Sequence, residues 1–462
     1  MTPLQTRQHP LPLSSRQDWC WQWMRSYPVD STPVEATETL SLRGPLDIGA
    51  LRDTLAEIET RHEALRLRLA APPGPDPSAA WPGQTLRPDP GALTVLPVPP
   101  QEATAEATRI LARPLDLTDR MTRATLLRAD PHEHLLVMQF HHLVVDGACH
   151  PLFRDLLAEG YARRVRRAPD TGQGRRRSEP ESYTALIARE GTPAARSAVR
   201  ERAAALARDL RAYGSGDPLP GDAGAVDRDT RFGSVPLGVP ADRTRRLLRG
   251  SRTERVTLHT VLLAALARAV ATEYDRDRLV CSVYTHGRTT PAAHETLGLF
   301  SNVVSARLDT APAPLPDFLR SVHDRVRDAA HDVDLPFTEV ASRVLPRPSD
   351  GGAYCRSALA HVELRLTGVT GWLPVDQHRP PAFPVPELAA TALDIQAPFT
   401  PPSFNSREQA LACAGTLFAT LDLADGALVG ALWYEHRYHD GERLARIAER
   451  YGDFLTELAP SP

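Results

Sequence analysis

Residues 133–140, EHLLVMQF, form an apolar run that passes directly into HHLVVDGACHP, and residues 152–164, LFRDLLAEGYARR, then place apolar side chains at helical spacing. This order predicts a strand, a sharp turn and a helix, and it favours a mixed α/β fold. Successive side chains on a strand point to opposite faces. His141 and His142 therefore cannot both face one cavity, so one of them is expected to be structural.

The strand-turn-helix segment around residues 141–149, called the histidine corner below, could form several kinds of site. A histidine suits proton transfer because its pKa lies near neutrality. Asp146 could orient the ring, or it could brace the turn by pairing with an arginine elsewhere. A metal site is not expected, because neighbouring histidines on a strand diverge and no further ligand cluster is evident. A Ser-His-Asp triad is disfavoured because no GxSxG motif occurs. Two structural histidines at a strand end remain the alternative to chemistry.

The 462 residues suit two domains of roughly 200 residues each. In the first third, EATETLSL alternates like a strand. The helical pattern that follows can be capped by Asp47 and places Leu51, Leu55 and Ile58 on one face. The second half is mixed again, with helical patterns at 183–190, 194–213 and 256–274, a buried strand at 278–288, and a strand and helix within 426–458.

Three stretches break these patterns. Residues 71–100 hold many of the 43 prolines and are expected to form an insertion or a long loop. Residues 165–182 are polar, basic and rich in helix breakers, and they contain the expected linker between the domains. Residues 367–410 are Pro-rich with little periodicity, and a loop of that length is usually a functional crossing or a lid.

Composition excludes several classes of protein. Hydrophobic residues make up 42% and charged residues 24%, as in globular proteins. The net charge of −3 indicates neither a nucleic-acid partner nor a membrane surface. Five cysteines without a CxxC pair indicate neither a disulfide framework nor a zinc site, so a reducing cytoplasm is expected. The N-terminus lacks a signal-peptide core, and no run reaches the ~18 apolar residues of a membrane span.

The segment HHLVVDG resembles the HHxxxDG motif of the condensation-domain family of nonribosomal peptide synthetases, which belongs to the superfamily of chloramphenicol acetyltransferase. Other matches follow in the family's order. They are SSRQDWCW for SxAQxRLW, RHEALRLRL for RHExLRTxF, YTALIARE for YxDFAVW, LGLFSNVVSAR for IGxFVNTxxxR, DVDLPFTEV for HQDYPFExVV, and CRSALAHV for an SRNPL-type element. Together they span nearly the whole chain, so the resemblance is to one complete condensation unit.

The resemblance implies an α/β fold of two acetyltransferase-like lobes, arranged as a V with a central tunnel. The expected N-terminal lobe covers residues 1–170, the linker 171–182 and the C-terminal lobe 183–462. In this arrangement, residues 284–300 form a floor loop of the tunnel. The Pro-rich residues 367–410 bridge the lobes.

The resemblance also assigns roles within the corner. It implies that His142 faces the reaction centre and that His141 packs behind it. Asp146 would form a structural salt bridge, for which Arg66 and Arg288 are the candidates. The resemblance thus implies that Asp146 keeps the corner rigid and that His142 takes up and releases a proton.

Other residues are expected to support the site. Gly147 would let the backbone approach a thioester, and a backbone N–H near it is a plausible donor to the oxyanion. Ser301 and Asn302 are expected to line or support the tunnel. Ala148 and Cys149 stand where the family has Trp-Ser. The thiol could be a nucleophile, although a small buried thiol at a helix start is the simpler interpretation.

The activity implied is transfer of an acyl or aminoacyl thioester from the phosphopantetheine arm of a carrier protein to an amine or alcohol. The enzyme itself would bind no cofactor, and it would act as a free-standing monomer on carriers in trans. Epimerization is disfavoured because Tyr284 stands where the EGHGRE motif has its glutamate, and the intact histidine pair disfavours heterocyclization. A polyketide-associated O-acyltransferase and a catalytically silent recruiter of carriers or oxygenases are the alternatives.

Overall fold

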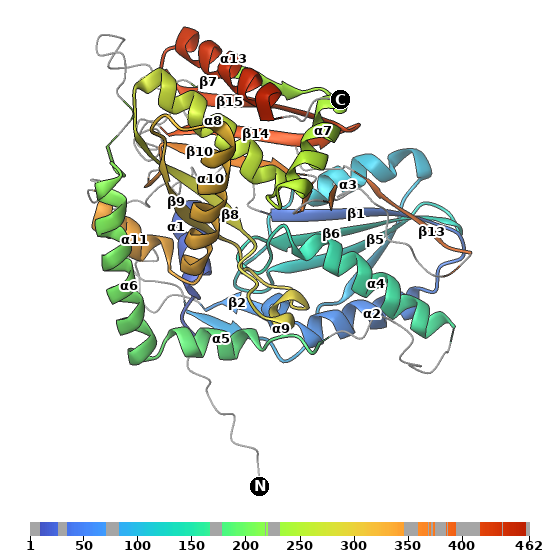
Figure 1. Ribbon diagram of the computed structural model, residues 1–462. Coiled ribbons are helices and arrows are strands. Elements are labelled where there is room, and N and C mark those ends of the chain that lie inside the picture. The colour runs from blue at the N-terminus through green and yellow to red at the C-terminus, as the bar shows by residue number, and fades with distance from the viewer. Residues whose placement is uncertain are drawn as a thin grey trace.

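The computed structural model describes residues 10–25, 35–70, 83–166, 178–217, 219, 232–345, 359–367, 369–370, 373–374, 385, 387–393, 416–436 and 438–458. Two large β-sheets, each with its own helices, form two lobes (Figure 1). Most of the predicted linker lies outside the described residues. So does the first half of the predicted SRNPL-type element, including Arg356.

The first sheet has the strand order β13-β1-β6-β5-β4. Its strands are β1 (Glu35–Arg43), β4 (Leu93–Pro97), β5 (Thr122–Arg128), β6 (Glu133–His141) and β13 (Ala389–Leu393). Its helices are α2 (Ile48–Arg61), α3 (Ala103–Leu111) and α4 (Cys149–Val165). Leu136, Met138 and Phe140 of β6 pack in the core of α2 and α4, whereas Leu135 and Val137 pack against α3. Burial of both faces explains why β6 is a continuous apolar run.

Helix α2 forms where its pattern predicts it. The Asp47 side chain accepts a hydrogen bond from the Ala50 N–H at 2.9 Å, and it satisfies one of the donors left open at a helix start. Leu51, Leu55 and Ile58 are buried on one face, and α2 packs against α4. The predicted cap and the predicted core face are confirmed.

The second sheet has the order β7-β15-β14-β10-β8-β9. Its strands are β7 (Phe232–Val239), β8 (Arg278–Thr285), β9 (Asn302–Asp309), β10 (Val362–Thr367), β14 (Leu417–Ala424) and β15 (Ala427–Glu435). Its helices are α7 (Ala241–Thr253), α8 (Leu258–Tyr274), α10 (Leu315–Ala329) and α13 (Gly441–Leu458). Helix α8 is buried over nearly its whole length in this core, as its apolar sequence predicts. In the described parts of the chain, no single helix is both long and apolar enough to cross a membrane.

One strand crosses between the lobes. Strand β13 follows the second lobe's β10 in the chain, yet it pairs antiparallel with β1 at the edge of the first sheet, from Thr39 opposite Leu393 to Arg43 opposite Ala389. The chain then returns to the second sheet through β14. The prediction that residues 367–410 contain a crossing is therefore confirmed at β13. The rest of that stretch is described only in the short pair β11 (Val369–Thr370) and β12 (Leu373–Pro374), at Val385 and in residues 387 and 388.

The prediction of a loop or insertion at residues 71–100 is wrong at two strands, residues 84–86 and 93–97, whereas residues 71–82 lie outside the described part of the chain. Strand β3 (Gln84–Leu86) pairs with β2 (Leu67–Leu69), and β4 adds a parallel edge strand beside β5. Pro97 ends β4 at this edge, where a residue without an N–H costs no ladder hydrogen bond. Prolines therefore mark a sheet edge here and do not exclude strands.

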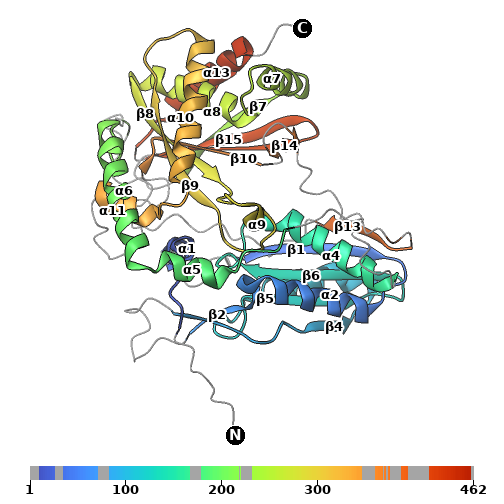
Figure 2. The same ribbon diagram turned by 60° about the horizontal axis from the view of Figure 1, so that its bottom comes forward.

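Several helices join the lobes. Helices α5 (Tyr183–Glu190) and α6 (Pro193–Ala212) run along one side of the molecule, past both lobes (Figure 2). The remaining helical elements are α1 (Ser15–Arg25), η1 (Glu63–Arg66), η2 (Pro100–Glu102), α9 (Pro291–His294), η3 (Ala330–Asp332) and α11 (Phe337–Val344). The core of the first sheet includes Tyr183 and Leu210 of these helices, and also Phe300 from the loop before β9. The two lobes therefore share one apolar core at their junction.

Candidate active site

The histidine corner lies at the end of β6. The strand ends at His141, residues 142–148 form turns and α4 begins at Cys149. The predicted strand, turn and helix are all present. The two histidines occupy different environments, His141 at the last position of the strand and His142 in the turn beyond it.

His141 is structural by its contacts. Its side chain is buried, and the Leu143 N–H donates to its Nδ1 at 3.2 Å, so Nδ1 carries no proton. Burial, together with the neighbouring His142, lowers the pKa of His141 from 6.5 to about 3. A neutral ring that accepts a backbone hydrogen bond holds the turn and has no exposed proton to exchange.

His142 is half-buried and is held in one tautomer. Its Nδ1 lies 2.8 Å from the Val145 carbonyl oxygen. A carbonyl oxygen only accepts, so the ring proton is on Nδ1 and the lone pair is on Nε2. A ring oriented in this way presents a base at Nε2.

Asp146 connects the two lobes. Its carboxylate is buried, and Oδ2 accepts hydrogen bonds from Arg288 Nη1, the Phe300 N–H and the Ser301 N–H, each at 2.9 Å. Its Oδ1 accepts from the Ala148 N–H at 3.2 Å. A buried carboxylate with this many donors fixes both the turn and the loop opposite.

The predicted salt bridge of Asp146 is confirmed with Arg288 and wrong with Arg66. Arg288 is buried and its Nη1 lies 2.9 Å from Asp146 Oδ2. Arg66 instead donates to the carbonyl oxygens of Glu59 at 3.0 Å and Arg87 at 2.6 Å, so it closes the loop between α2 and β3. Backbone carbonyls satisfy its guanidinium locally.

Arg288 holds the rest of the floor loop. Its Nη2 donates to the Gly298 carbonyl at 3.1 Å and the Thr296 carbonyl at 3.3 Å, and its guanidinium lies 4.8 Å from the centre of the Phe300 ring. Burial by itself would lower the pKa of Arg288, but the Asp146 carboxylate and the sulfur beside it raise that pKa above its usual value. The guanidinium therefore stays charged and organises the loop around itself.

Cys149 contacts the same groups, and Asp146, Arg288 and Cys149 together are called the hub below. Its thiol donates to the Gly298 carbonyl at 3.3 Å, and its sulfur accepts from the Gly298 N–H and from Arg288 Nη2, each at 3.4 Å. Burial and the nearby Asp146 carboxylate raise the pKa of the Cys149 thiol to about 12. The thiol is therefore a small buried donor at the start of α4, which is the simpler of its two predicted interpretations.

The remaining predicted residues serve different parts of the structure. Asn302 donates to the Val333 and Leu335 carbonyls, each at 2.8 Å, and ties β9 to the chain before α11. Ser301 contributes its backbone N–H to Asp146. Tyr284 is half-buried at the end of β8, where its hydroxyl accepts from Arg365 Nη2 at 2.6 Å. Asn302 is therefore a structural support. The Tyr284 hydroxyl instead binds Arg365 of β10.

Two glycines of the site differ in kind. Gly287 has a φ of +65°, and a Cβ there would lie 1.9 Å from the Phe300 carbonyl oxygen. Only glycine fits this position, which the sequence analysis did not single out. Gly147 is exposed, and a Cβ there would meet no atom within 4 Å. The predicted approach of a thioester to this backbone stays a prediction.

Three long-range contacts that the sequence analysis missed also hold the corner and its floor loop. They are Gln17 Nε2 to the Leu143 carbonyl (3.0 Å), the Leu297 N–H to His62 Nδ1 (3.2 Å), and the Tyr183 hydroxyl to the Leu299 carbonyl (2.9 Å). All three side chains belong to motif matches noted above. The motifs marked these positions, but they did not reveal the partners.

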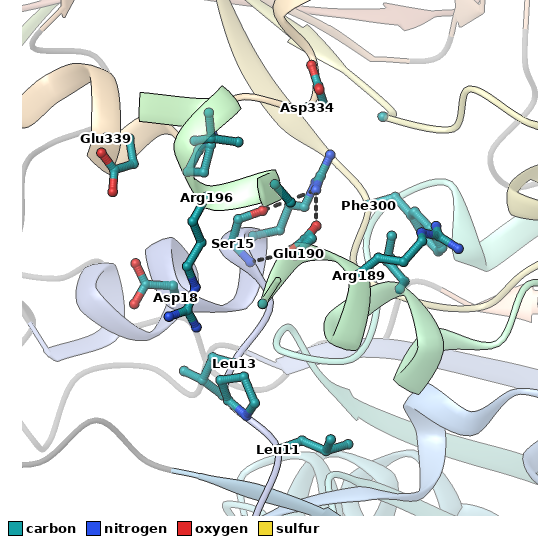
Figure 3. A pocket seen from close by; sticks show the side chains of 18 of the residues that line it. Leu11, Leu13, Ser15, Asp18, Arg189, Glu190, Arg196, Phe300, Asp334 and Glu339 are labelled. Carbon is teal, nitrogen blue, oxygen red and sulfur yellow. Dashed lines mark hydrogen bonds and ion pairs between the residues drawn. The ribbon is translucent and has the colours of Figure 1, made fainter. Parts of the chain in front are cut away.

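A cavity of about 1240 Å³ opens beside the hub, between α1, the N-terminal end of α6 and the loop before β9 (Figure 3). Gly287 and Phe300 line its buried end. Small-molecule pockets usually hold ~300–1,000 Å³, so this cavity has room for a long, flexible ligand. In the described part of the chain, no group of three His, Cys, Asp or Glu side chains is placed to hold a metal ion.

Comparison with known proteins identifies the family. A family model described as Condensation domain matches residues 7–350. The chain belongs to the condensation-domain family. The predicted resemblance is confirmed.

Relatives of this condensation domain are nonribosomal peptide synthetases. The probable non-canonical synthetase CymA of Salinispora arenicola is 30% identical over 377 residues, which cover 78% of this chain and 5% of that protein. The isonitrile lipopeptide synthase of Mycobacterium tuberculosis is 29% identical over 74% of this chain and 14% of its own length. The condensation domain therefore matches only a small part of each of these relatives.

Solved structures share its fold. The X-domain from teicoplanin biosynthesis has a TM-score of 0.67 at 23% identity, covering 99% of this chain and 96% of its own. The condensation domain of the Monacolin K polyketide synthase MokA has a TM-score of 0.68 at 16% identity, covering 98% of both chains. The first condensation domain of the calcium-dependent antibiotic synthetase has a TM-score of 0.60 at 20% identity, also covering 98% of both chains. These likenesses confirm the predicted α/β fold of two acetyltransferase-like lobes.

Replacing Gly287 with alanine should destabilise the condensation domain by about 2 kcal/mol or more, because the new Cβ would collide with the Phe300 carbonyl at a left-handed φ. The matched control is Gly147→Ala, which meets no atom and should change the free energy of unfolding by less than about 0.5 kcal/mol. Urea unfolding monitored by circular dichroism measures both. Equal losses for the two variants would contradict the assignment of Gly287.

The buried His141 should make the domain less stable in mild acid. Folded His141 stays neutral down to about pH 3, whereas the unfolded chain takes up this proton near its usual pKa of 6.5. Stability should therefore fall as the pH falls between these values, by up to about 1.4 kcal/mol per pH unit from this one group.

Substitution of His141 by asparagine tests this dependence. Asparagine keeps an acceptor for the Leu143 N–H but removes the titration, so H141N should lose stability less steeply below pH 6.5 than the wild type. The exposed His132 provides the control, and H132N should keep the wild-type slope. Urea unfolding across this pH range gives the slopes, and an unchanged slope in H141N would refute the buried neutral ring.

Proposed function

We propose that this condensation domain transfers an acyl or aminoacyl group from the phosphopantetheine thioester of a carrier protein to an amine or alcohol. The observation that carries the proposal is the orientation of His142, whose Nδ1 donates to Val145 and whose Nε2 therefore holds the lone pair. This base stands on a turn that Asp146 and Arg288 fix across the two lobes. Acyl transfer needs a base of this kind to take up the proton of the acceptor.

The proposed reaction makes one bond and breaks one. The acceptor's nitrogen or oxygen attacks the thioester carbonyl carbon while its proton moves to His142 Nε2. The tetrahedral intermediate then expels the phosphopantetheine thiolate, which takes the proton from His142 and leaves as the thiol. A backbone N–H near Gly147 is our candidate donor to the oxyanion, since no side chain fills the space beside it.

The nature of the acceptor sets how much the base contributes. An α-amine is partly neutral near pH 8, so that orientation supplies much of the rate enhancement. An alcohol is a far weaker acid, and its attack depends more on proton transfer to Nε2. Loss of the histidine should therefore cost more in ester formation than in amide formation.

The partners follow from the proposed reaction. The donor is the loaded arm of a carrier protein, and the acceptor is a small molecule or a second carrier-bound group. The cavity beside Gly287 and Phe300 is the proposed passage for one of these substrates. Support comes from the family, whose relatives here are peptide synthetases.

A second candidate is a recruiting protein without catalysis. The observation that favours it is the likeness of fold to the teicoplanin X-domain, which has been solved in a complex with OxyB. That likeness is at 22% identity. We rank it second because this chain keeps both histidines and places His142 as a base.

Replacing His142 with alanine should lower the rate of acyl transfer by about 100- to 10,000-fold, because the acceptor loses its proton acceptor. The measurement is intact-mass detection of acyl loss from loaded carrier proteins, offered with a panel of amines and alcohols. His132→Ala, an exposed histidine outside the site, should keep the wild-type rate. Transfer by H142A at the wild-type rate would contradict the assignment of the base.

The same assay separates the two candidates. A wild-type protein that turns over any acceptor in the panel is a catalyst. A wild-type protein that binds carriers or an oxygenase without releasing acyl groups from any of them is a recruiter, and this result would overturn the proposal.

A further inference from the structure

The second sheet packs on helices with one face only. Val362 and Leu364 of β10, like Cys281 and Val283 of β8, belong to the core that includes α8 and α13. The alternation of a strand places the residues between them on the opposite face, called the inner face below. There Val280 of β8 packs in the core at the junction of the lobes. Figure 2 shows β10 and β14 between these helices and the first lobe, so the inner face is turned toward the first lobe.

A buried acid on the inner face holds an arginine in place. Glu363 of β10 has no exposed surface, and its carboxylate pairs with Arg365 Nε at 2.9 Å. Taking a carboxylate out of water is costly unless a donor compensates for it. The guanidinium of Arg365 is therefore fixed at its Nε.

Two aromatic rings hold the same guanidinium. It lies over the ring of Tyr284 from β8, 4.6 Å from the centre, and over the ring of Phe418 from β14, 4.5 Å from the centre. Its Nη2 also donates to the Tyr284 hydroxyl at 2.6 Å. Even so, 46% of the Arg365 side chain is exposed. A ligand that binds an arginine already held in this way immobilises little more of it, so less entropy is lost on binding.

Arg365 also lies close to the hub. Tyr284 precedes Arg288 of the hub by four residues, and four residues of chain span at most about 14 Å. Neither Tyr284 nor Arg365 lines the cavity of about 1240 Å³. A substrate that contacts Arg365 would therefore approach the hub by a route other than this cavity.

We infer that Arg365 binds the carboxylate of the acceptor, so that the acceptor is an amino acid or a hydroxy acid that is not bound to a carrier. This inference rests on the proposed function and names the class of its acceptor. A guanidinium binds a carboxylate through parallel N–H donors. The carboxyl group of the donor is consumed in its thioester, as is that of an acceptor on a carrier. An acceptor that is free of a carrier keeps its carboxylate.

The variants separate carboxylate binding from folding. Loss of Arg365 alone would leave Glu363 buried without its cation, which is strongly destabilising. E363Q/R365Q removes both charges together, and R365K keeps the charge but loses the planar set of donors. The control is R268Q, because Arg268 of α8 lies 4.2 Å over the ring of Phe318 in α10. R268Q therefore removes a comparable contact of the same lobe, among the helices and away from the inner face.

The first measurement is steady-state acyl transfer to free amino acids, to their 2-hydroxy analogues and to the carboxamide of each. The wild type should prefer each acid to its carboxamide by about tenfold or more in kcat/KM. E363Q/R365Q should lose this preference through a higher KM for the acids, with kcat within about threefold of wild type. R365K should keep part of the preference, and R268Q should keep all of it.

Three results of this measurement would overturn the inference. One is a preference for acids that survives in E363Q/R365Q. Another is a wild type that uses carrier-bound acceptors and none of the free acids. The third is a higher KM for the donor in place of the acceptor, which would assign Arg365 to a second carboxylate on the donor's acyl group.

A binding measurement keeps this inference separate from the proposed function. Saturation-transfer NMR with the same acids and carboxamides requires no turnover. Binding of an acid, but not of its carboxamide, that E363Q/R365Q abolishes and R268Q preserves would support the carboxylate site even if the wild type transfers no acyl group. Wild-type transfer to amines or alcohols, with acids and carboxamides bound equally, would overturn the site and leave the proposed function intact.

Discussion

The buried carboxylate of Asp146 is the interaction on which the site depends. It belongs to the turn after β6, yet it accepts hydrogen bonds from Arg288 and from two backbone N–H groups of the opposite lobe, each at 2.9 Å. Taking such a charge out of water is costly unless donors surround it, so the turn and the floor loop must be formed together. The lobes are thereby fixed to one another at the point where His142 stands.

This constraint explains how two adjacent histidines divide their roles. The strand directs His141 into the core, where burial holds it neutral and the turn uses it as an acceptor. The turn then places His142 with Nδ1 on Val145. Gln17 donates to the carbonyl of Leu143, the residue after His142, so the turn is held from α1 as well as from the opposite lobe. The oriented ring is a consequence of the structure around it.

Local patterns in the sequence predicted the local structure. The cap at Asp47, the buried face of α2 and the strand-turn-helix corner all depend on neighbours within a few residues, and all were correct. The partner of Asp146 is 142 residues away along the chain, so local patterns could not identify it and the resemblance left both Arg66 and Arg288 as candidates. Prolines near β4 were misread as a loop because an edge strand tolerates them. The left-handed Gly287 gave no signal, because its need for glycine comes from the distant Phe300 carbonyl.

The central claim is that Asp146 and Arg288 act as one unit across the lobes. A double-mutant cycle in urea unfolding with D146N, R288Q and the double variant tests it most directly. Each single variant should lose about 3–5 kcal/mol, since it leaves an uncompensated buried group, and the double variant should lose much less than the sum. Losses that simply add would contradict the account.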